Sequence, residues 1–425
     1  MRGLAMLRSF FPLLGMLLLA QPLQAQDDER SQADYEDNPG FGGPESITEQ
    51  LKRADESRDA LYEWPFFDGY FDWKEQVKED YDVSFGMHFY GLYQKATDSL
   101  AGRDDDAMGN IFRFLGNWTV FEKENGNLGR IEWRLESRSD WFGLQAPGSL
   151  GSATGVATLA PGFAYSDNFD LDLAVLNWTQ GFANGKAGYA VGRLAFDAYL
   201  DAFPFQTFSK GFINRSFILN PTLPTTGVGA LGGVVKGFVT DNFWIGGQVH
   251  DANAASGEFD FDTVREGEWL KAIEVGYTPS FGQRKTQLVQ LTYWDKDERS
   301  LAGVSSGSGW AISAAWKLND TYFPFVRFGH SDGGGGVAAE DAISAGVEIS
   351  RPRGEVWTIG AGWAKPSEAT FGQGLDDEKV VEMSYRFPIS ENLSLLPDVQ
   401  VIFSPANNPG RSSIWVLGLR AILTL

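Results

Sequence analysis

The sequence predicts an all-β fold, a transmembrane antiparallel β-barrel of about sixteen strands with a short N-terminal helical segment. About sixteen segments alternate apolar and polar residues, as strands do when one face meets lipid and the other meets water. The connections between these segments alternate short and long, as they do in barrels with turns at one rim and loops at the other. Beyond its first residues the chain has no run near the ~20 apolar residues that a spanning helix needs. A membrane location therefore requires a closed barrel.

The expected strands follow one another from residue 83 to the end of the chain. Their side chains alternate with a period of two, so that successive residues point to opposite faces of the sheet. The segments are 83–95, 111–122, 128–141, 169–181, 186–198, 233–240, 243–252, 268–279, 285–297, 309–318, 322–331, 342–350, 355–364, 378–387, 393–403 and 412–425.

The short connections carry residues typical of tight hairpins. They are Asn125-Gly126-Asn127, Asn184-Gly185, Thr240-Asp241-Asn242, Asn319-Asp320 and Arg351-Pro352-Arg353-Gly354. Gly and Asn tolerate the positive φ angles that such turns require. The intervening connections are longer, and an even number of strands with short turns at one rim places both termini in the periplasm.

The composition fits this architecture. The 425 residues include 14 Trp, 13 Tyr and 32 Phe, which suit aromatic girdles at two membrane interfaces, and 50 Gly, which suit turns and crowded strand crossings. The chain has no Cys, so that neither a disulfide nor a lipid-modified cysteine is available. A large soluble β-sandwich or propeller would show the same alternation, but the regular change between short and long connections argues against it.

Three regions divide the chain. Residues 1–25 have the features of a secretory signal peptide, with Arg2 and Arg8 before an apolar stretch too short to anchor the protein. Residues 26–82 are expected to form an acidic N-terminal tail and a short helical periplasmic segment, and residues 83–425 the outer-membrane β-barrel. Ser46 and Glu49 have the spacing of a capping box, which predicts a helix running to about residue 61. The charged surface of this helix favours a solvated helix tethered to the barrel over a plug inside it.

One strand predicts what the lumen presents to a solute. Every second residue in this strand is charged, and these residues are Arg130, Glu132, Arg134, Glu136 and Arg138. Their common face must line water, because an Arg at the bilayer midplane costs roughly 2–4 kcal/mol. Charges of alternating sign offer donors and acceptors to the hydroxyls of a neutral polyol. The alternative is that these charges only pair with one another across the wall of a general pore.

The longest connection, 199–232, is the predicted constriction, since loops of this length are usually functional or disordered. Four phenylalanines before the middle of the loop are Phe203, Phe205, Phe208 and Phe212. They supply apolar surface for folding into the lumen and ring faces on which a solute could stack. Anchoring of the loop to the wall or to a neighbouring subunit is an equal alternative for them. Asp197, Asp201 and Arg215 flank the loop or lie within it and would complete a polar eyelet.

Three segments carry a resemblance to a known family. Val191-Gly192-Arg193-Leu194 up to Asp201, followed by Phe212-Ile213-Asn214, resembles the strand-to-loop segment of the carbohydrate-selective porins of the OprB type. Residues 393–402 with Pro405, Asn408-Pro409 and Leu417-Gly418-Leu419-Arg420 resemble that family's terminal hairpin, and Val83-Ser84-Phe85-Gly86 before residues 90–94 resembles its first strand. The resemblance implies sixteen strands, a homotrimer in the outer membrane of a Gram-negative cell, and passive, substrate-selective uptake of monosaccharides.

The expected pore-lining and substrate-binding residues are Arg130, Glu132, Arg134, Glu136, Arg138, Arg193, Asp197, Asp201, Phe205 and Arg215. The formal net charge is -21, and much of the acid lies in the tail and in the long loops, where it suits divalent-cation bridging to lipopolysaccharide beside the outer-membrane lipid. The last residue, Leu425, departs from the family, because outer-membrane barrels usually end in an aromatic residue.

An enzyme is the competing class of protein. The chain has 3 His and lacks a nucleophile elbow, a zinc-binding His motif and a phosphate-binding loop. Glu132 and Glu136 resemble a carboxylate pair, but Arg134 between them would keep both ionised. No cofactor, catalytic metal site or nucleic-acid partner is expected. A general or cation-preferring diffusion porin without sugar selectivity is the alternative channel, since it needs the same polar lumen and inward loop.

Overall fold

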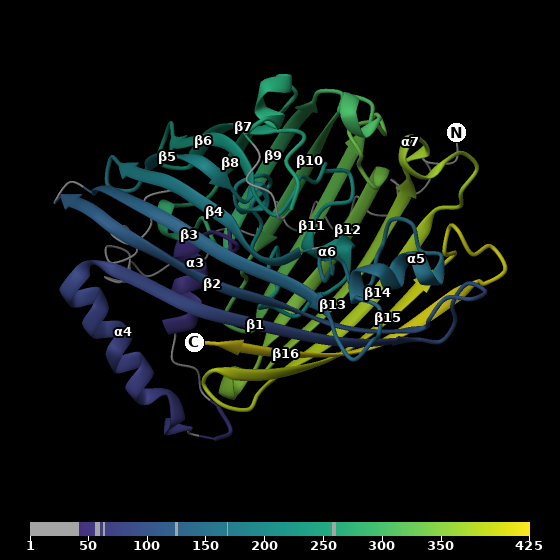
Figure 1. Ribbon diagram of the computed structural model, residues 1–425, viewed down its shortest axis with the longest axis horizontal. Coiled ribbons are helices and arrows are strands. Elements are labelled where there is room, and N and C mark those ends of the chain that lie inside the picture. The colour runs from purple at the N-terminus through teal and green to yellow at the C-terminus, as the bar shows by residue number, and fades with distance from the viewer. Residues whose placement is uncertain (1–41, 56–59, 63, 124–125, 168, 257–260) are drawn as a thin grey trace.

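The computed structural model describes residues 42–55, 60–62, 64–123, 126–167, 169–256 and 261–425. The expected signal peptide and most of the acidic tail lie outside the described residues. In the described part, sixteen strands form one closed antiparallel barrel, in which β1 pairs with β16 and every other pair joins strands adjacent in the chain (Figure 1). Closure leaves no edge strand, so that the backbone hydrogen bonds between strands are satisfied all round the barrel.

The strands of the barrel have the following bounds. They are β1 Val83–Ala96, β2 Asp106–Lys123, β3 Asn127–Asp140, β4 Phe169–Phe182, β5 Ala187–Leu194, β6 Ala230–Phe238, β7 Phe243–Asp251, β8 Trp269–Tyr277, β9 Gln287–Lys296, β10 Gly307–Trp316, β11 Tyr322–Ser331, β12 Ala339–Ser350, β13 Val356–Pro366, β14 Glu378–Pro388, β15 Leu393–Phe403 and β16 Ser413–Thr424. The prediction of a sixteen-stranded antiparallel barrel is confirmed.

Strand β5 ends earlier than predicted, at Leu194 and not near residue 198. Gly192 has a φ of 135°, a backbone conformation that strains any residue with a Cβ atom. The chain then leaves the sheet and forms a 3-10 helix at Phe196–Ala198. The extended pattern in the sequence therefore continues past the point where the backbone turns inward.

Burial along the strands alternates between the inside and the outside of the barrel. In β9, Leu288 and Trp294 face inward and are buried. Val289 and Tyr293 lie between such positions and keep 36% and 49% of their surface exposed on the outer wall. Apolar residues that remain exposed on the outside of a barrel are those that lipid covers. Among the described residues, no helix has the length and the apolar character needed to cross a bilayer.

The connections separate into two rims. One rim, called here the short-turn rim, carries the turns after even-numbered strands and the end of the chain. The opposite rim, the long-loop rim, carries the short helices α5 Leu150–Thr154 and α7 Glu368–Phe371 (Figure 1). Residues 195–229, called here the constriction loop, run from β5 to β6 and include the helix α6 Arg215–Ile218. This arrangement of rims is the one that the turn residues predict.

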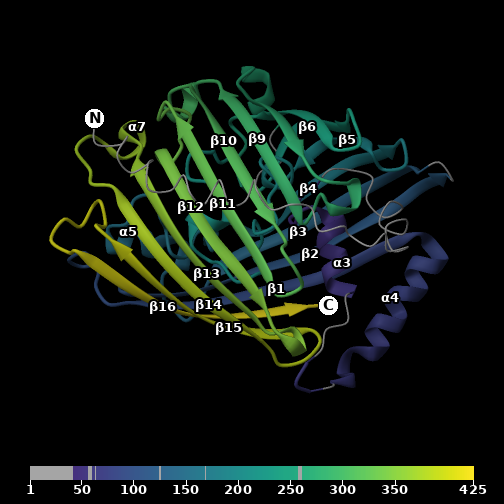
Figure 2. The ribbon, with the colours of Figure 1, turned by 180° about the vertical axis from the view of Figure 1, so that it is seen from behind.

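The helix α3 Ile47–Asp55 lies inside the barrel, so that the prediction of a solvated, tethered helix is wrong (Figures 1 and 2). Ile47 and Leu51 are buried in a cluster with residues of the barrel wall. The Glu49 carboxylate accepts a hydrogen bond from Lys285 Nζ at 2.7 Å. The Ser46 hydroxyl has no hydrogen-bond partner among the described residues, so that it does not make the bond of the predicted capping box. The charged surface that suggested solvation instead meets opposite charges on the inner wall.

A second helix, α4 Asp68–Tyr81, follows outside the barrel and leads into β1 (Figures 1 and 2). The sequence analysis expected no helix at these residues. Asp82 has a φ of 57° and ends the helix, because a residue in the left-handed region cannot continue α-helical hydrogen bonding. The chain thus passes from the lumen, over the short-turn rim, to the outer wall before the first strand begins.

Candidate functional site: the constriction of the barrel

The predicted charged face of β3 points into the barrel. Arg130, Glu132, Arg134 and Glu136 are buried there, whereas the alternate residues of the strand keep part of their surface exposed on the outside. The interior around these residues is packed by α3 and by the constriction loop. The alternation of the sequence was therefore sufficient to predict which face of this strand is internal.

Glu136 is the centre of a charge network. Its carboxylate, which is fully buried, accepts hydrogen bonds from Arg113 Nε at 2.8 Å and Arg138 Nε at 2.7 Å. Arg134 Nε lies 3.0 Å from the same carboxylate. The alternative in which the charges pair with one another is thus observed for this part of the strand. Three guanidinium groups can be buried around one carboxylate because other hydrogen-bond acceptors also lie near them.

Arg113 is a member of this network that the sequence analysis missed. It lies on β2 directly opposite Glu136 in the strand register, and the same alternation of residues could have identified it. Its Nη1 atom donates to the Glu45 carboxylate at 2.5 Å and to Gln50 Oε1 at 2.9 Å. Burial alone would raise the pKa of Glu45, but the Arg113 and Arg53 guanidinium groups outweigh it and hold this pKa below its usual range. Arg113 therefore ties the internal helix α3 to the barrel wall.

Arg130 and Glu132 have other partners. Glu132 accepts hydrogen bonds from Thr179 Oγ1 at 3.0 Å and from Thr48 Oγ1 at 3.3 Å, while Arg130 Nε donates to Thr119 Oγ1 at 3.1 Å. The ladder is therefore divided, with hydroxyl partners toward the short-turn rim and the Glu136 network toward the long-loop rim.

The constriction loop crosses the barrel interior. On one side Arg134 Nη2 donates to the Val228 carbonyl of the loop at 3.3 Å. On the other side the loop residue Asp201 forms an ion pair with Arg327 of β11. Seven strands lie between β3 and β11 in either direction round the sixteen-stranded barrel, so that these contacts lie on opposite walls. The prediction that this connection folds into the lumen is confirmed.

Further contacts fix the middle of the loop. The Glu382 carboxylate of β14 accepts from the backbone N–H groups of Ile213 at 2.6 Å and Asn214 at 3.1 Å. Arg420 of β16 donates to the carbonyls of Phe212 at 3.2 Å and Gly211 at 3.0 Å. Charge-assisted hydrogen bonds of this kind are stronger than those between neutral groups. The loop is consequently held by side chains from several strands that lie far from it in the sequence.

The aromatic residues of the loop pack against one another and against β11. The ring centroids of Phe205 and Phe325 are 4.8 Å apart, and those of Phe212 and Phe217 are 4.6 Å apart. Phe205 has no exposed surface, so that it packs the loop onto the wall and does not line open space, contrary to its predicted role. Asp201 is also fully buried and holds the loop instead of lining the pore.

Three further residues that the sequence predicted for the site are Asp197, Arg193 and Arg215. Asp197 is in the 3-10 helix after β5 and is electrostatically coupled to Arg134 and Arg113. Arg193 Nη2 donates to the Ala255 carbonyl at 3.3 Å, in the connection between β7 and β8. Its electrostatic partner is Asp172 of β4. Arg193 is thus directed to a different part of the structure from Asp197.

Arg215 stands at the start of α6 and projects from the constriction loop. Its guanidinium lies 4.7 Å from the centroid of the Phe163 ring. Burial lowers the pKa of Arg215 to about 10, which leaves it protonated at neutral pH. Its Nε atom, like Nη1 of Arg134, is buried without a hydrogen-bond acceptor among the described residues. Arg215 on the loop and Arg134 on the wall therefore each retain an N–H donor for a further ligand.

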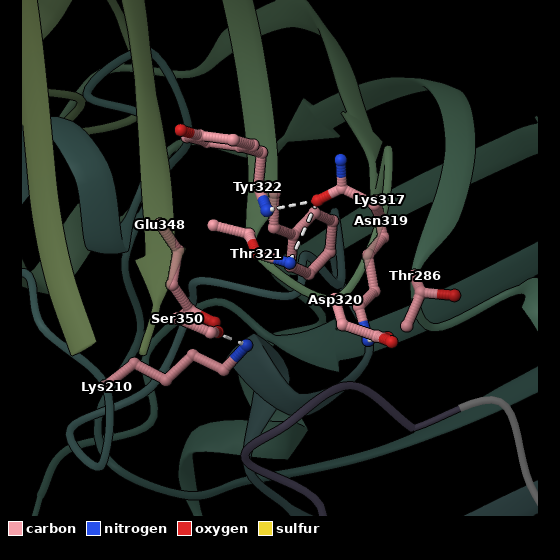
Figure 3. A pocket seen from close by; sticks show the side chains of 10 residues that line it. Lys210, Thr286, Lys317, Asn319, Asp320, Thr321, Tyr322, Glu348 and Ser350 are labelled. Carbon is pink, nitrogen blue, oxygen red and sulfur yellow. Dashed lines mark hydrogen bonds and ion pairs between the residues drawn. The ribbon is translucent and has the colours of Figure 1, made fainter. Parts of the chain in front are cut away.

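A cavity of 310 Å³ lies between α3, the constriction loop and the wall near the short-turn rim. Lys236, Glu274 and Arg284 contribute charges to its lining. A neighbouring cavity of 170 Å³ shares Lys210 and Phe323 with it (Figure 3). Figure 3 shows that Lys210 points across this second cavity toward Glu348, and the two charged groups are 3.7 Å apart. Both cavities thus lie between the constriction loop and the short-turn rim, and charged side chains line both of them.

Comparison with known proteins agrees with this geometry. Residues 286–425 match the family model described as carbohydrate-selective porin, OprB family. A structure of Pseudomonas putida OprB at high pH superposes with a TM-score of 0.68 at 13% identity, over 84% of this chain and 97% of that chain. A mutant of the Rh. blastica porin superposes with a TM-score of 0.50 at 12% identity, over 81% of this chain and 100% of that one. No curated protein sequence matches the chain.

A closed sixteen-stranded antiparallel barrel with an inward loop and a charged interior is the architecture of outer-membrane porins. The structural likeness shows this fold. The family match relates residues 286–425, which include β9 to β16, to the OprB family of carbohydrate-selective porins.

Proposed function

We propose that this carbohydrate porin admits monosaccharides by passive diffusion, and that the constriction loop together with the β3 ladder forms its selective passage. The observation that carries the proposal is the course of the loop between opposite walls, from Val228 beside Arg134 to Asp201 beside Arg327. A loop held across a barrel interior narrows the path available to a solute. Selectivity then depends on the side chains that border the remaining space.

The chemistry of this region suits a neutral, hydroxyl-rich solute. The buried carboxylates of Glu136 and Glu45 offset two of the three positive charges around Glu136, so that the network has only a small net charge and does not require an ionic substrate. The donors left over at Arg134 Nη1 and Arg215 Nε need an oxygen acceptor, and a buried donor without one costs about 1–3 kcal/mol. A sugar hydroxyl would supply that acceptor. The planar guanidinium groups would also fix the direction from which the hydroxyl binds.

The remaining assignments of the function rest on the family and on the layout of the barrel. We place the short-turn rim on the periplasmic side and the long-loop rim outside the cell, as single-chain barrels have them. We also propose a homotrimer, contacts with lipopolysaccharide at the acidic outer loops, and export by a cleaved signal peptide. These proposals fit the acidic composition and the even number of strands.

Conductance in planar bilayers tests the proposal. The purified protein should conduct small ions, and glucose or xylose added at increasing concentration should reduce this current in a saturable way, because sugar and ions share the same passage. A matched measurement with an anionic sugar phosphate of similar size should give weaker block, since the acidic exterior repels it. Free passage of ions with no block by either sugar would support a general or cation-preferring diffusion porin instead.

A further inference from the structure

The helix α4 divides its residues between two sides. Successive residues of an α-helix are rotated by about 100°, which places four of the five acidic residues on one side. These residues are Asp68, Asp72, Glu75 and Glu79, whereas Asp80 lies beside Trp73. The opposite side carries the aromatic and apolar residues Tyr70, Trp73, Val77 and Tyr81, and Phe71 lies at the border between the two sides. Lys74 and Lys78, the two basic residues of the helix, lie on the aromatic side and toward its border.

The aromatic side of α4 packs on the outside of the barrel. Phe85 of β1 points outward, because His88 and Tyr90, at the alternate positions of the strand, are buried inside. The centroids of the Trp73 and Phe85 rings are 5.0 Å apart, and the contact continues from Phe85 to Phe114 of β2 at 6.1 Å. The helix therefore begins on the surface that faces lipid.

The helix also lies at the level of the short-turn rim. The segment before it donates backbone hydrogen bonds from Leu61 to Pro388 and from Tyr62 to Ile389, where the turn between β14 and β15 begins. At the other end, Thr119 near the end of β2 donates its N–H to the Asp82 carbonyl. Figures 1 and 2 show α4 outside the barrel, running across the direction of β1. A helix in this position lies along the rim and not along the strands.

Several rings of this segment remain uncovered. Trp64, Phe66, Trp73 and Tyr81 expose 53%, 76%, 52% and 66% of their surfaces. Outward-facing rings at the same rim, such as Trp118 and Phe243, expose 45% and 52%. Aromatic residues are enriched where a membrane protein meets the headgroup region of a bilayer. The uncovered rings of residues 64–81 thus continue the aromatic girdle of the barrel.

We infer that α4 is an interfacial helix whose aromatic side enters the headgroup region of the periplasmic leaflet and whose acidic side faces the periplasm. The inference goes beyond the sugar channel and depends only on the outer-membrane location of the barrel. Lysines at the border of an apolar face can extend toward lipid phosphates, as Lys78 is placed to do. The phospholipid surface is therefore the occupant that matches both the rings and the charges. The helix would hold the chain at the rim where it leaves the lumen and enters β1.

Single cysteines can test this inference, because the natural chain has no Cys. Phe66→Cys and Tyr81→Cys place a nitroxide label on the aromatic side, and Asp72→Cys and Glu79→Cys are matched controls on the acidic side. The labelled proteins are reconstituted in vesicles of phosphatidylethanolamine and phosphatidylglycerol. Accessibility to oxygen, which concentrates in the bilayer, is compared with accessibility to a water-soluble nickel chelate. Unchanged ion conductance in planar bilayers shows that each labelled barrel is intact.

We expect labels at residues 66 and 81 to lose accessibility to the nickel chelate and to gain accessibility to oxygen relative to the two controls. Equal accessibility of all four labels to the chelate would overturn the inference, because the helix would then lie in water. Labels at 66 and 81 that are shielded from both probes and show spin coupling between subunits would also overturn it. That result would assign the aromatic side to a second copy of the chain.

Discussion

Replacing Asp201 with Ala should release the beginning of the constriction loop from the wall formed by β9 to β11. Asp201 is fully buried and pairs with Arg327, which exposes 1% of its surface. The carboxylate also accepts hydrogen bonds from Gln290 Nε2 at 2.9 Å and from Ser313 Oγ at 2.9 Å. Each of these three donors belongs to the wall, so that Asp201 is the single loop side chain on which they converge.

The size of the effect follows from leaving Arg327 buried without its partner. Removing one member of a buried ion pair costs about 3–5 kcal/mol. Since 1.36 kcal/mol corresponds to a factor of ten, the released state should become roughly 10² to 10⁴ times more populated relative to the bound state. The contacts of Glu382 and Arg420 would still hold the middle of the loop. The expected change is therefore a partial opening and not the loss of the loop from the lumen.

Single-channel recording can measure this opening. The Asp201→Ala channel should show higher mean conductance, more current noise and weaker sugar block than the unmodified channel. Asp297→Asn is a control, because the Lys271–Asp297 pair is exposed and such pairs contribute about 0–1 kcal/mol. The double change Asp201→Leu with Arg327→Met should restore much of the normal behaviour, since no uncompensated charge remains. Normal conductance and block in a correctly assembled Asp201→Ala channel would refute the role assigned to this contact.

Three other variants test separate parts of the structure. Arg134→Ala should weaken sugar binding by about 1–3 kcal/mol and make the pore more cation-selective. Titration of the current with sugar measures the first effect, and reversal potentials measure the second. If sugar block and reversal potential are both unchanged, Arg134 lies outside the passage. Phe205→Ala should destabilise loop packing by about 3–5 kcal/mol, measured as faster amide exchange across residues 203–217 with the strands unaffected. The pKa of Glu45 is held low, so the Glu45 carboxylate contributes fully to the docking of α3 at neutral pH, and this contribution is lost as the pH falls through the lowered pKa. A label on a cysteine at position 51, in place of Leu51, should therefore become accessible only in acid. In the Glu45→Gln variant the same label should be accessible at neutral pH. A pH-independent label at Leu51 would show that α3 is held without this charge.

The sequence predicted the barrel because its signals are local and repeat many times. Alternation determines the inner and outer faces of each strand, and residues such as Asn184-Gly185 determine where a strand ends. Both signals lie within a few residues of the features they predict. The inward direction of the β3 ladder follows from them, and so does the separation of short turns from long loops.

The partners of the internal charges could not be predicted in the same way. Whether Glu45 meets water or Arg113 depends on a contact between residues 68 positions apart, and nothing in the local pattern around Glu45 indicates it. The same holds for Asp201 and Arg327, which are 126 positions apart. The helix α3 was therefore assigned to solvent on its charge, although the charge is neutralised inside the barrel. A charged helix is compatible with either location until its partners are known.

These partners also indicate which cations can act in selectivity. Arg113 and Arg138 have their guanidinium groups engaged with carboxylates of the network, and Arg327 and Arg420 are engaged in holding the loop. Arg134 and Arg215, and Arg420 at its Nε atom, each keep a buried N–H donor without an acceptor among the described residues. A passing sugar can compensate that deficit with its hydroxyl oxygens, whereas a small monovalent anion can satisfy only one donor site at a time. We therefore propose that selection for sugars depends on donors that the folded chain leaves unused, and not on the total positive charge along β3.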